Sequence, residues 1–386
     1  MPTIMDTAAL TPILQFGTSR FLQAHADLFL SEALAAGRGL GRITVVQTTD
    51  SAASALKTAA LASGQPYPVI IQGRQQGVEI QRTLWSNSIA GAVHAHSAWP
   101  ALRRGFVTDV QVVLSNTGDN GYRLDDRDGP EALAANATAP HSFPAKLLVL
   151  LHERWQENSA APLSLFPCEL VSRNGDVLRE VVAGLAKHWG LEPAFGDYLA
   201  SHCKWANSIV DRIVSEALDP IGAVAEPYAL WAIEAQPGLQ LPCAHPAIVV
   251  TDSLQGYERL KLLILNLSHT YLAERWQRAQ DNPGLTVYQA LNRPYYRDDL
   301  EGLWATEVLP VFAALGEEAS ARRYLDGVRD RLLNPFLQHR LADIAQNHAE
   351  KKRRRLLPLV ELAARHAPQL PLPRLSAALA ATGDTL

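Results

Sequence analysis

The sequence predicts an α/β fold: a domain with a parallel β-sheet over residues 1–252, followed by a mainly α-helical domain over residues 253–386. Short apolar runs rich in β-branched residues alternate with helical stretches in the first part, and after Gly256 the hydrophobic pattern is almost entirely helical. The chain has 386 residues, of which 47% are apolar and 19% charged. That composition supplies enough apolar material for one large core or two smaller ones.

Three predicted strands carry the parallel sheet. The first covers residues 12–17 and stops at a glycine, the second covers residues 42–49, and the third covers residues 110–115. A helix over residues 20–36 separates the first two strands. Strand, helix and strand in this order imply parallel pairing through right-handed crossovers.

A hairpin and further helices complete the first domain. Residues 67–73 and 77–85 alternate in the manner of two paired strands and are predicted to form a hairpin inserted into the strand and helix pattern. Amphipathic helices are predicted over residues 142–155 and 176–189. Residues 247–251 are predicted to form the last strand.

Composition and charge exclude several classes of protein. Lys plus Arg total 35 against 39 Asp plus Glu, a net charge of -4, which argues against nucleic acid as a partner. No stretch approaches the roughly 18 to 20 apolar residues of a spanning helix, and the first residues do not resemble a secretory signal. Cys168, Cys203 and Cys243 are odd in number and widely spaced, as expected of free buried thiols. We therefore expect a cytoplasmic monomer or small homo-oligomer that acts on a small molecule.

Residues 257–269 carry the strongest chemical signal. At about 100° per residue from Lys261, Glu258 lies at about 60° and His269 at about 80°. Asn266 lies at about 140° on the same side, and the other positions are mostly leucine and isoleucine, so the helix should be buried. Burial lowers the pKa of a lysine, which makes Lys261 a candidate general base whose proton Glu258 passes onward. Asn266 could hold a developing alkoxide and His269 could orient a hydroxyl.

The alternative for this helix is structural: Lys261 extends to solvent and His269 is an ordinary hydrogen-bonded core histidine. Tyr257 and Lys261 also have the spacing of the tyrosine and lysine of short-chain dehydrogenases. However, the chain is too long for that group and lacks its glycine-rich start.

The turn over residues 17–24 follows the first strand and opens a helix, the setting in which a dinucleotide pyrophosphate binds. Its glycine fingerprint is incomplete, because Ser19 stands at the second glycine position. Asp50 ends the second strand and is placed to accept a hydrogen bond from an adenosine ribose, which favours NAD. The alternative is an ordinary strand-to-helix turn with a solvated aspartate.

Two other patterns are weaker. His94 and His96 lack a third ligand, so no metal site is predicted. The basic run over residues 351–355 would most often be a solvated face, but cations turned inward could bind a substrate carboxylate or phosphate.

These residues together resemble the polyol-specific long-chain dehydrogenases, the mannitol dehydrogenase family, and within it the branch that interconverts tagaturonate and altronate. The resemblance covers roughly residues 12–380. It rests on matching segments along the chain: Gln15-Phe16-Gly17-x-x-x-Phe21-Leu22-x-Ala24, Ser115-Asn116-Thr117, Ser142-Phe143-Pro144-Ala145-Lys146-Leu147, Pro167-Cys168-Glu169-Leu170, Val210-Asp211-Arg212, Tyr257-Glu258-Arg259-x-Lys261 with Asn266 and His269, and Asn334-Pro335-x-x-x-His339 leading to Arg353-x-Arg355.

The resemblance implies a Rossmann-type first domain, NAD as cofactor and no metal. It implies that Lys261 is the acid/base, that Asn266 polarises the carbonyl and that His269 positions the substrate. The expected cofactor contacts are Gly17, Ser19, Arg20, Phe21, Asp50, Asn116, Thr117, Val210 and Asp211. The expected substrate contacts are Asn334, His339, Lys351, Arg353 and Arg355, with the three cations holding a carboxylate.

The sequence departs from the family pattern at three positions. Ser19 replaces a glycine, Gln23 replaces a common arginine, and Leu170 replaces a second oxyanion-stabilising asparagine, for which Asn174 is the candidate substitute. The expected function is that of an NAD-dependent, metal-independent oxidoreductase interconverting a keto-sugar acid and its hydroxy acid. The alternatives are a polyol or polyol-phosphate dehydrogenase, and a sugar-acid binding protein without catalysis.

Overall fold

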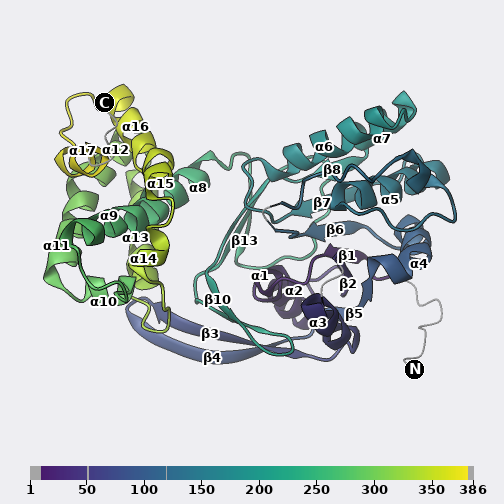
Figure 1. Cartoon of the computed structure of the whole chain (residues 1–386), viewed down its shortest axis with the longest axis horizontal. Coiled ribbons are helices and arrows are strands. Elements are labelled where there is room, and N and C mark those ends of the chain that lie inside the picture. The colour runs from purple at the N-terminus through teal and green to yellow at the C-terminus, as the bar shows by residue number, and fades with distance from the viewer. Residues whose placement is uncertain (1–9, 50–51, 119, 381–386) are drawn as a thin grey trace. The chain divides into compact units, whose positions relative to one another are not determined.

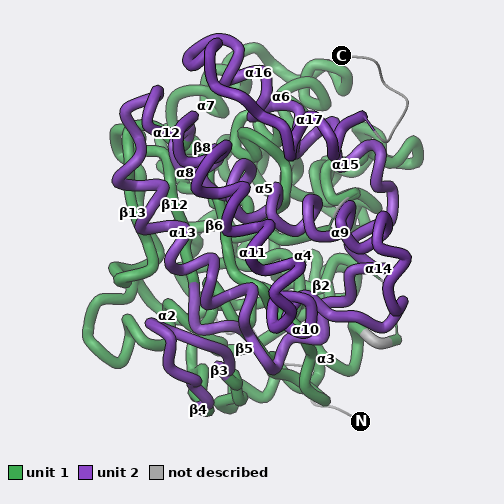
Figure 2. The backbone as a smooth tube through the Cα atoms, turned by 90° about the vertical axis from the view of Figure 1, so that its left-hand side faces the viewer, with its two compact units in different colours: residues 1–70, 83–225, 229–254 green, residues 71–82, 226–228, 255–386 purple. Residues whose placement is uncertain are grey.

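The computed structural model describes residues 10–49, 52–118 and 120–380 (Figure 1). The chain forms two compact units (Figure 2). Unit 1 comprises residues 1–70, 83–225 and 229–254, and unit 2 comprises residues 71–82, 226–228 and 255–386. The predicted fold class is confirmed, because unit 1 contains a parallel sheet and residues 255–380 are mainly helical.

The central sheet of unit 1 has six strands, all parallel. In spatial order they are β5 (Ile89–His94), β2 (Ile43–Gln47), β1 (Ile13–Phe16), β6 (Val112–Ser115), β7 (Leu163–Pro167) and β8 (Cys203–Trp205). Strand order therefore reverses between β1 and β6, which is the Rossmann arrangement. The three predicted strands are confirmed as β1, β2 and β6, whereas β5, β7 and β8 were not predicted.

Helices cover both faces of this sheet, which explains its sequence. Every residue of β1, β2 and β6 is buried, as β-branched and apolar strands between two helical layers should be. One face packs on α4 (Ala95–Thr108), α5 (Phe143–Glu157), α6 (Asn174–His188) and α7 (Pro193–Ser201) in a shared apolar core. In Figure 1, α2 (Ala26–Ala35) and α3 (Ala52–Ala62) lie on the other side.

The helix predicted over residues 20–36 is two helices, α1 (Arg20–Gln23) and α2. They are separated because His25 has a non-helical backbone, with φ -125° and ψ -100°. Its ring packs against Phe21 and Phe29 at centroid distances of 4.7 and 4.6 Å, and its Nε2 contacts the carbonyl oxygen of Leu230 at 3.1 Å. A side chain that serves the core in this way outweighs local helix propensity.

Two smaller sheets complete the strands. The predicted hairpin is confirmed as β3 (Tyr67–Gln75) and β4 (Val78–Ser86), which join β10 (Val214–Ala217) and β11 (Ala223–Ala225) in the order β10-β11-β3-β4. The predicted last strand is confirmed as β13 (Ile248–Thr251), in a sheet with β12 (Leu230–Glu234) and β9 (Ser208–Asp211). A short 3₁₀ helix, η1, covers Pro130–Leu133.

The helices of unit 2 enclose a second apolar core, to which Leu267, Leu272 and Phe312 belong. No helix in the described part of the chain has both the length and the apolar character needed to cross a membrane. The elements of unit 2 from residue 255 are α8 (Gln255–Leu260), η2 (Lys261–Asn266), α9 (Leu267–Ala279), α10 (Val287–Leu291), α11 (Pro294–Leu303), η3 (Trp304–Val308), α12 (Leu309–Ala314), α13 (Glu318–Leu332), α14 (Leu341–Ile344), α15 (His348–Arg355), α16 (Leu357–His366) and α17 (Pro373–Ala380). The elements η2 and η3 are π-helical.

Candidate functional site

The carboxyl ends of β1 and β6 lie side by side at the reversal of strand order, with Phe16 opposite Ser115. In open α/β sheets, ligands bind at this point. Gly17 follows β1 with φ +116°, and a Cβ atom there would lie 2.5 Å from the carbonyl oxygen of Asn116. Only glycine fits this close approach of the two turns.

The two departures in the turn after β1 have structural explanations. Ser19 is the N-cap of α1, and its side chain accepts a hydrogen bond from the N–H of Leu22. Gln23 is buried, and its amide oxygen accepts the N–H of Gly222 at 2.7 Å. Of the other expected cofactor residues here, Arg20 is exposed, and Phe21 is half-buried against His25 as described above. Asp50 lies outside the described residues.

A buried carboxylate that the sequence did not single out, Glu169, organises the loop after β6. Its Oε1 accepts hydrogen bonds from the backbone N–H and the hydroxyl of Thr117, both at 2.9 Å. Its Oε2 accepts the hydroxyl of Ser115 at 3.0 Å. The amide of Asn116 donates to the carbonyl of Cys168 at 2.8 Å. The sequence feature that could have indicated this role is a glutamate directly after the apolar residues 163–167. A glutamate in such a position is rarely buried unless it has hydrogen-bond partners.

The expectation that Asn174 replaces the missing oxyanion asparagine is wrong. Asn174 is fully buried, and its amide group donates to the carbonyls of Pro167 at 2.8 Å and Glu169 at 3.3 Å. Its oxygen accepts the N–H of Ser208 at 2.9 Å. With these contacts its amide has no hydrogen left for a substrate. Leu170 itself is 78% exposed.

Two expected cofactor residues lie on another strand. Val210 and Asp211 are buried in β9, opposite Trp231 and Leu230 of β12. Within the described ranges, no group of three or more His, Cys, Asp or Glu residues is arranged to hold a metal ion.

In unit 2, the helix predicted over residues 257–269 contains a π-helical turn that changes its geometry. The segment η2 begins at Lys261 and ends at Asn266, and the N–H of Leu267 reaches the carbonyl of Leu262, five residues back. Such i to i+5 hydrogen bonding turns the chain by roughly 80° per residue instead of 100°.

The π-turn aligns the candidate catalytic residues better than the sequence predicted. Five steps at roughly 80° place Asn266 about 40° from Lys261, and three further α-helical steps place His269 about 20° from Lys261. A continuous α-helix would give about 140° and about 80°. Lys261, Asn266 and Glu258 are half-buried, so the full burial expected of this helix does not extend to them.

His269 is buried, with only 8% of its surface exposed. Burial holds the pKa of His269 well below its ordinary value of 6.5, and the charges of Arg331 and Arg355 act in the same direction. The ring is therefore neutral at pH 7. A neutral imidazole has one N–H donor and one acceptor nitrogen, and the acceptor suits a substrate hydroxyl.

His339 lies beside His269, with a ring centroid distance of 4.9 Å (interplanar angle 56°). Burial lowers the pKa of His339, and the charges of Lys351 and Arg355 lower it further, against the opposing effect of Asp343. The expected catalytic histidine therefore packs against one expected substrate residue, His339, and the charges of two others, Lys351 and Arg355, act on that second ring.

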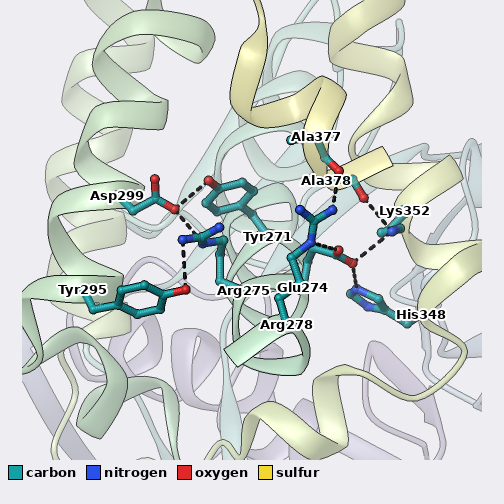
Figure 3. A network of polar contacts seen from close by, with 10 residues as sticks. All are labelled: Tyr271, Glu274, Arg275, Arg278, Tyr295, Asp299, His348, Lys352, Ala377 and Ala378. Atoms are coloured by element: carbon teal, nitrogen blue, oxygen red, sulfur yellow. Dashed lines mark hydrogen bonds and ion pairs between the residues drawn. The ribbon is translucent and has the colours of Figure 1, made fainter. Parts of the chain in front are cut away.

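The basic run on α15 is divided by the helix. Lys352 is 1% exposed and donates to Glu274 at 2.9 Å and to the carbonyl of Ala378 at 2.6 Å (Figure 3). Burial alone would raise the pKa of Glu274, but hydrogen bonds from His348, Lys352 and Arg278 lower it to about 2. Lys352 thus fastens α17 to α9, a role that the run of five cations did not reveal.

The other cations of α15 differ in exposure. Arg353 is exposed, and Arg354 is exposed and paired with Glu350 at 3.3 Å. Lys351 and Arg355 are half-buried four residues apart, so they share one side of the helix. Lys351 donates to the carbonyl of Ile344 at 2.8 Å. Burial lowers the pKa of both groups.

Arg355 has neither a hydrogen bond nor an ion pair with any residue in the described part of the chain. A desolvated cation without a counter-charge, next to Lys351, is a site at which an anion would be stabilised.

Asn334, another expected substrate residue, is 5% exposed and has structural partners. Its amide nitrogen donates to the carbonyl of Gln72 at 3.3 Å, and its oxygen accepts the N–H of Phe336 at 3.0 Å. It therefore ties the loop after α13 to the outer part of the β3–β4 hairpin.

Comparison with known proteins agrees with this architecture. Residues 11–241 match the family model of the mannitol dehydrogenase Rossmann domain, and residues 253–383 match that of the mannitol dehydrogenase C-terminal domain. The chain is 30% identical to the altronate oxidoreductase of Halalkalibacterium halodurans, over 90% of this chain and 69% of that protein. It is also 30% identical to the altronate oxidoreductase of Bacillus subtilis, over 93% of this chain and 76% of that protein.

Solved structures have the same fold at lower identity. D-sorbitol dehydrogenase in its substrate-free form aligns with a TM-score of 0.77 and 17% identity, covering 97% of this chain and 80% of that one. The mannitol 2-dehydrogenase of Pseudomonas fluorescens, in a ternary complex with NAD and D-mannitol, aligns with a TM-score of 0.70 and 18% identity, covering 97% and 79%. From the two matching domain models and the relatives that span most of its length, the chain belongs to the mannitol dehydrogenase family of oxidoreductases.

Proposed function

We propose that the protein is an NAD-dependent, metal-independent oxidoreductase that interconverts a keto-sugar acid and its hydroxy acid, of the tagaturonate and altronate type. The observation that carries the choice of a sugar acid is the unpaired, half-buried Arg355 beside Lys351 and two neutral imidazoles. Two curated altronate oxidoreductases with 30% identity support the same substrate class. The enzyme acts in the cytoplasm as a monomer or small homo-oligomer, and its three buried, unpaired cysteines suit a reducing compartment.

The carboxyl edge of the sheet in unit 1 fits a dinucleotide. Gly17 lets the turns after β1 and β6 approach each other, and Asn116 and Thr117 are fixed by hydrogen bonds to Cys168 and Glu169. When bound, NAD(H) supplies or accepts the hydride. The other cofactor contacts in the proposal are Ser19, Arg20, Phe21, Asp50, Val210 and Asp211.

The proton is handled by the side chains on η2 and α9. During reduction Lys261 protonates the developing alkoxide, and during oxidation it removes the alcohol proton, which Glu258 passes onward. The amide of Asn266 has no hydrogen bond within the described residues, so it can donate to the reacting oxygen. His269 accepts a hydrogen bond from a neighbouring substrate hydroxyl. This assignment needs no metal, because a cationic lysine and an amide stabilise the oxygen.

The substrate carboxylate lies at Lys351 and Arg355, with His339 beside it. Arginine binds a carboxylate through two parallel hydrogen bonds, which gives both affinity and orientation. Arg353 and Asn334, also expected to contact the substrate, are less suited to bind the carboxylate, because Arg353 is exposed and Asn334 is hydrogen-bonded to backbone groups. The proposal therefore assigns the carboxylate to two cations.

Two measurements test the proposal. Titration with NADH, followed by nicotinamide fluorescence, should show saturable binding, and a panel of hexuronates, aldonates, polyols and polyol phosphates should show turnover of tagaturonate or altronate above the rest. Preference for mannitol or a sugar phosphate would replace the sugar acid with the polyol alternative. Absence of NADH binding and of turnover would leave a sugar-acid binding protein.

The role of the lysine needs its own variant. Lys261→Met should retain NADH binding and lose turnover, since the side chain keeps its length but has no proton to exchange. Lys187→Met, at an exposed position of α6, is the matched control and should leave both unchanged. A Lys261→Met enzyme with wild-type kcat would refute this part of the proposal.

A further inference from the structure

The π-turn that aligns Lys261 with Asn266 and His269 ends in a row of side-chain hydrogen bonds. The hydroxyl of Ser268 donates to the carbonyl of Ile264, and the hydroxyl of Thr270 donates to that of Asn266. Each donor lies four residues after its acceptor. Such back-bonding competes with the regular ladder and bends helices, so this row favours the change from π to α geometry.

Of these two donors, Ser268 also accepts a hydrogen bond from another element. The indole N–H of Trp304, in η3, donates to the Ser268 hydroxyl at 2.8 Å. An indole nitrogen can only donate, so the serine oxygen must be the acceptor and its proton must go to Ile264. Trp304, Ser268 and Ile264 are 2%, 0% and 0% exposed. Water therefore does not compete for these hydrogen bonds, and each one strengthens the next.

Trp304 also contacts a charged side chain. The guanidinium carbon of Arg329 lies 5.5 Å from the centroid of the Trp304 ring. Arg329 in turn pairs with Glu301 at 2.8 Å and with Asp326 at 2.8 Å. This contact helps to hold the indole in the position in which its N–H donates to Ser268. A flexible partner could not hold the serine proton on one carbonyl in this way.

We propose that Trp304 and Ser268 are positioning residues, which keep η2 in its π geometry and thereby keep Lys261 on the side of Asn266 and His269. The proposal rests on the function proposed above for these three residues. If the turn relaxed to α geometry, Asn266 would move from about 40° to about 140° away from Lys261. A displacement of this kind removes the proton donor from the reacting oxygen while leaving most binding contacts in place.

The experiment compares Ser268→Ala, Trp304→Phe and the double variant with the wild type. Trp304→Phe removes the N–H and keeps an aromatic ring. The control is Thr306→Val, in the other π-helix, η3. It removes an exposed hydroxyl that donates to the carbonyl of Gly302 and accepts from Arg374. Each variant is assayed for kcat, KM, NADH affinity, the pH profile of kcat, and hydrogen–deuterium exchange of the peptide covering residues 261–270.

We expect kcat of each single variant to fall at least about ten-fold, with KM and NADH affinity changed less than about three-fold and the pH profile displaced. The double variant should be no slower than the slower single variant, since both act through one hydroxyl. Exchange over residues 261–270 should be faster in all three and unchanged in Thr306→Val.

Additive losses of kcat, or losses no larger than that of Thr306→Val, would overturn the inference, and so would unchanged exchange over residues 261–270. The exchange measurement needs no turnover. If the wild type oxidises or reduces none of the substrates, the proposed function fails, yet the effect of Trp304 and Ser268 on the π-turn is still tested.

Discussion

Arg355→Gln removes a half-buried positive charge from the proposed carboxylate site and leaves an amide in its place. A hydrogen bond between charged groups contributes about 1.5–3 kcal/mol, and about 1.4 kcal/mol corresponds to a factor of ten in rate or affinity. Because Arg355 pairs with no carboxylate in the described part of the chain, the whole lost interaction should appear as weaker binding of the substrate. We expect kcat/KM for tagaturonate to fall about ten- to hundred-fold, mostly through KM.

The assay compares tagaturonate with a neutral ketose of the same chain length, for which kcat/KM should change less than about three-fold. Arg353→Gln is the matched control: it changes the same charge two residues away at an exposed position, and both substrates should be affected less than about three-fold. Equal losses for the acid and the neutral ketose in Arg355→Gln would refute the reasoning, because a carboxylate contact cannot affect a substrate that has no carboxylate.

Three further predictions concern stability and the nucleotide turn. Burial raises the pKa of Asp27 from 3.8 to about 7, so the folded state binds the proton more tightly and the free energy of unfolding falls as pH rises between these values. In urea unfolding, Asp27→Asn should be more stable than the wild type at pH 8, by at most about 4 kcal/mol, and should lose that advantage near pH 4. Glu274→Gln leaves the ammonium of Lys352 buried without its carboxylate and should lower the free energy of unfolding by about 3–5 kcal/mol. Glu350→Gln, in an exposed ion pair, should lower it by less than about 1 kcal/mol, and similar losses for the two variants would contradict a stabilising role for the buried pair. Gly17→Ala forces a side chain into a positive φ and against a backbone carbonyl, so NADH affinity should drop at least about ten-fold in a fluorescence titration; unchanged affinity would separate this turn from the cofactor.

The sequence was sufficient to predict β1, β2 and β6, which are mainly apolar or β-branched. β2, which contains Ile43 and two valines, is buried on both faces, as its composition predicts. β8 has only three residues, Cys203–Trp205, with a lysine in the middle, and belongs to the sheet through its partner β7 rather than through its own pattern. Strands of this length have no periodicity to detect.

The candidate site was predictable in its residue types but not in its geometry. Hydrophobic periodicity assumes a constant 100° per residue, so it could place Lys261 and Asn266 on one side of a helix but could not detect a π-turn between them. The basic run shows the same limit. Lys352 faces inward because it forms an ion pair with Glu274, which lies 78 residues earlier in the chain. No local pattern distinguishes Lys352 from its exposed neighbour Arg353.

Because of the π-turn, the spacing of the three proposed catalytic groups along the chain depends on the local helix geometry as well as on their chemistry. Lys261, Asn266 and His269 are separated by five and three positions, yet they stack as residues separated by four and three would on a regular helix. To place these three side chains in the same arrangement on a designed scaffold of straight helices, the first interval should be shortened by one residue. Copying the natural spacing onto such a scaffold would turn the amine away from the amide.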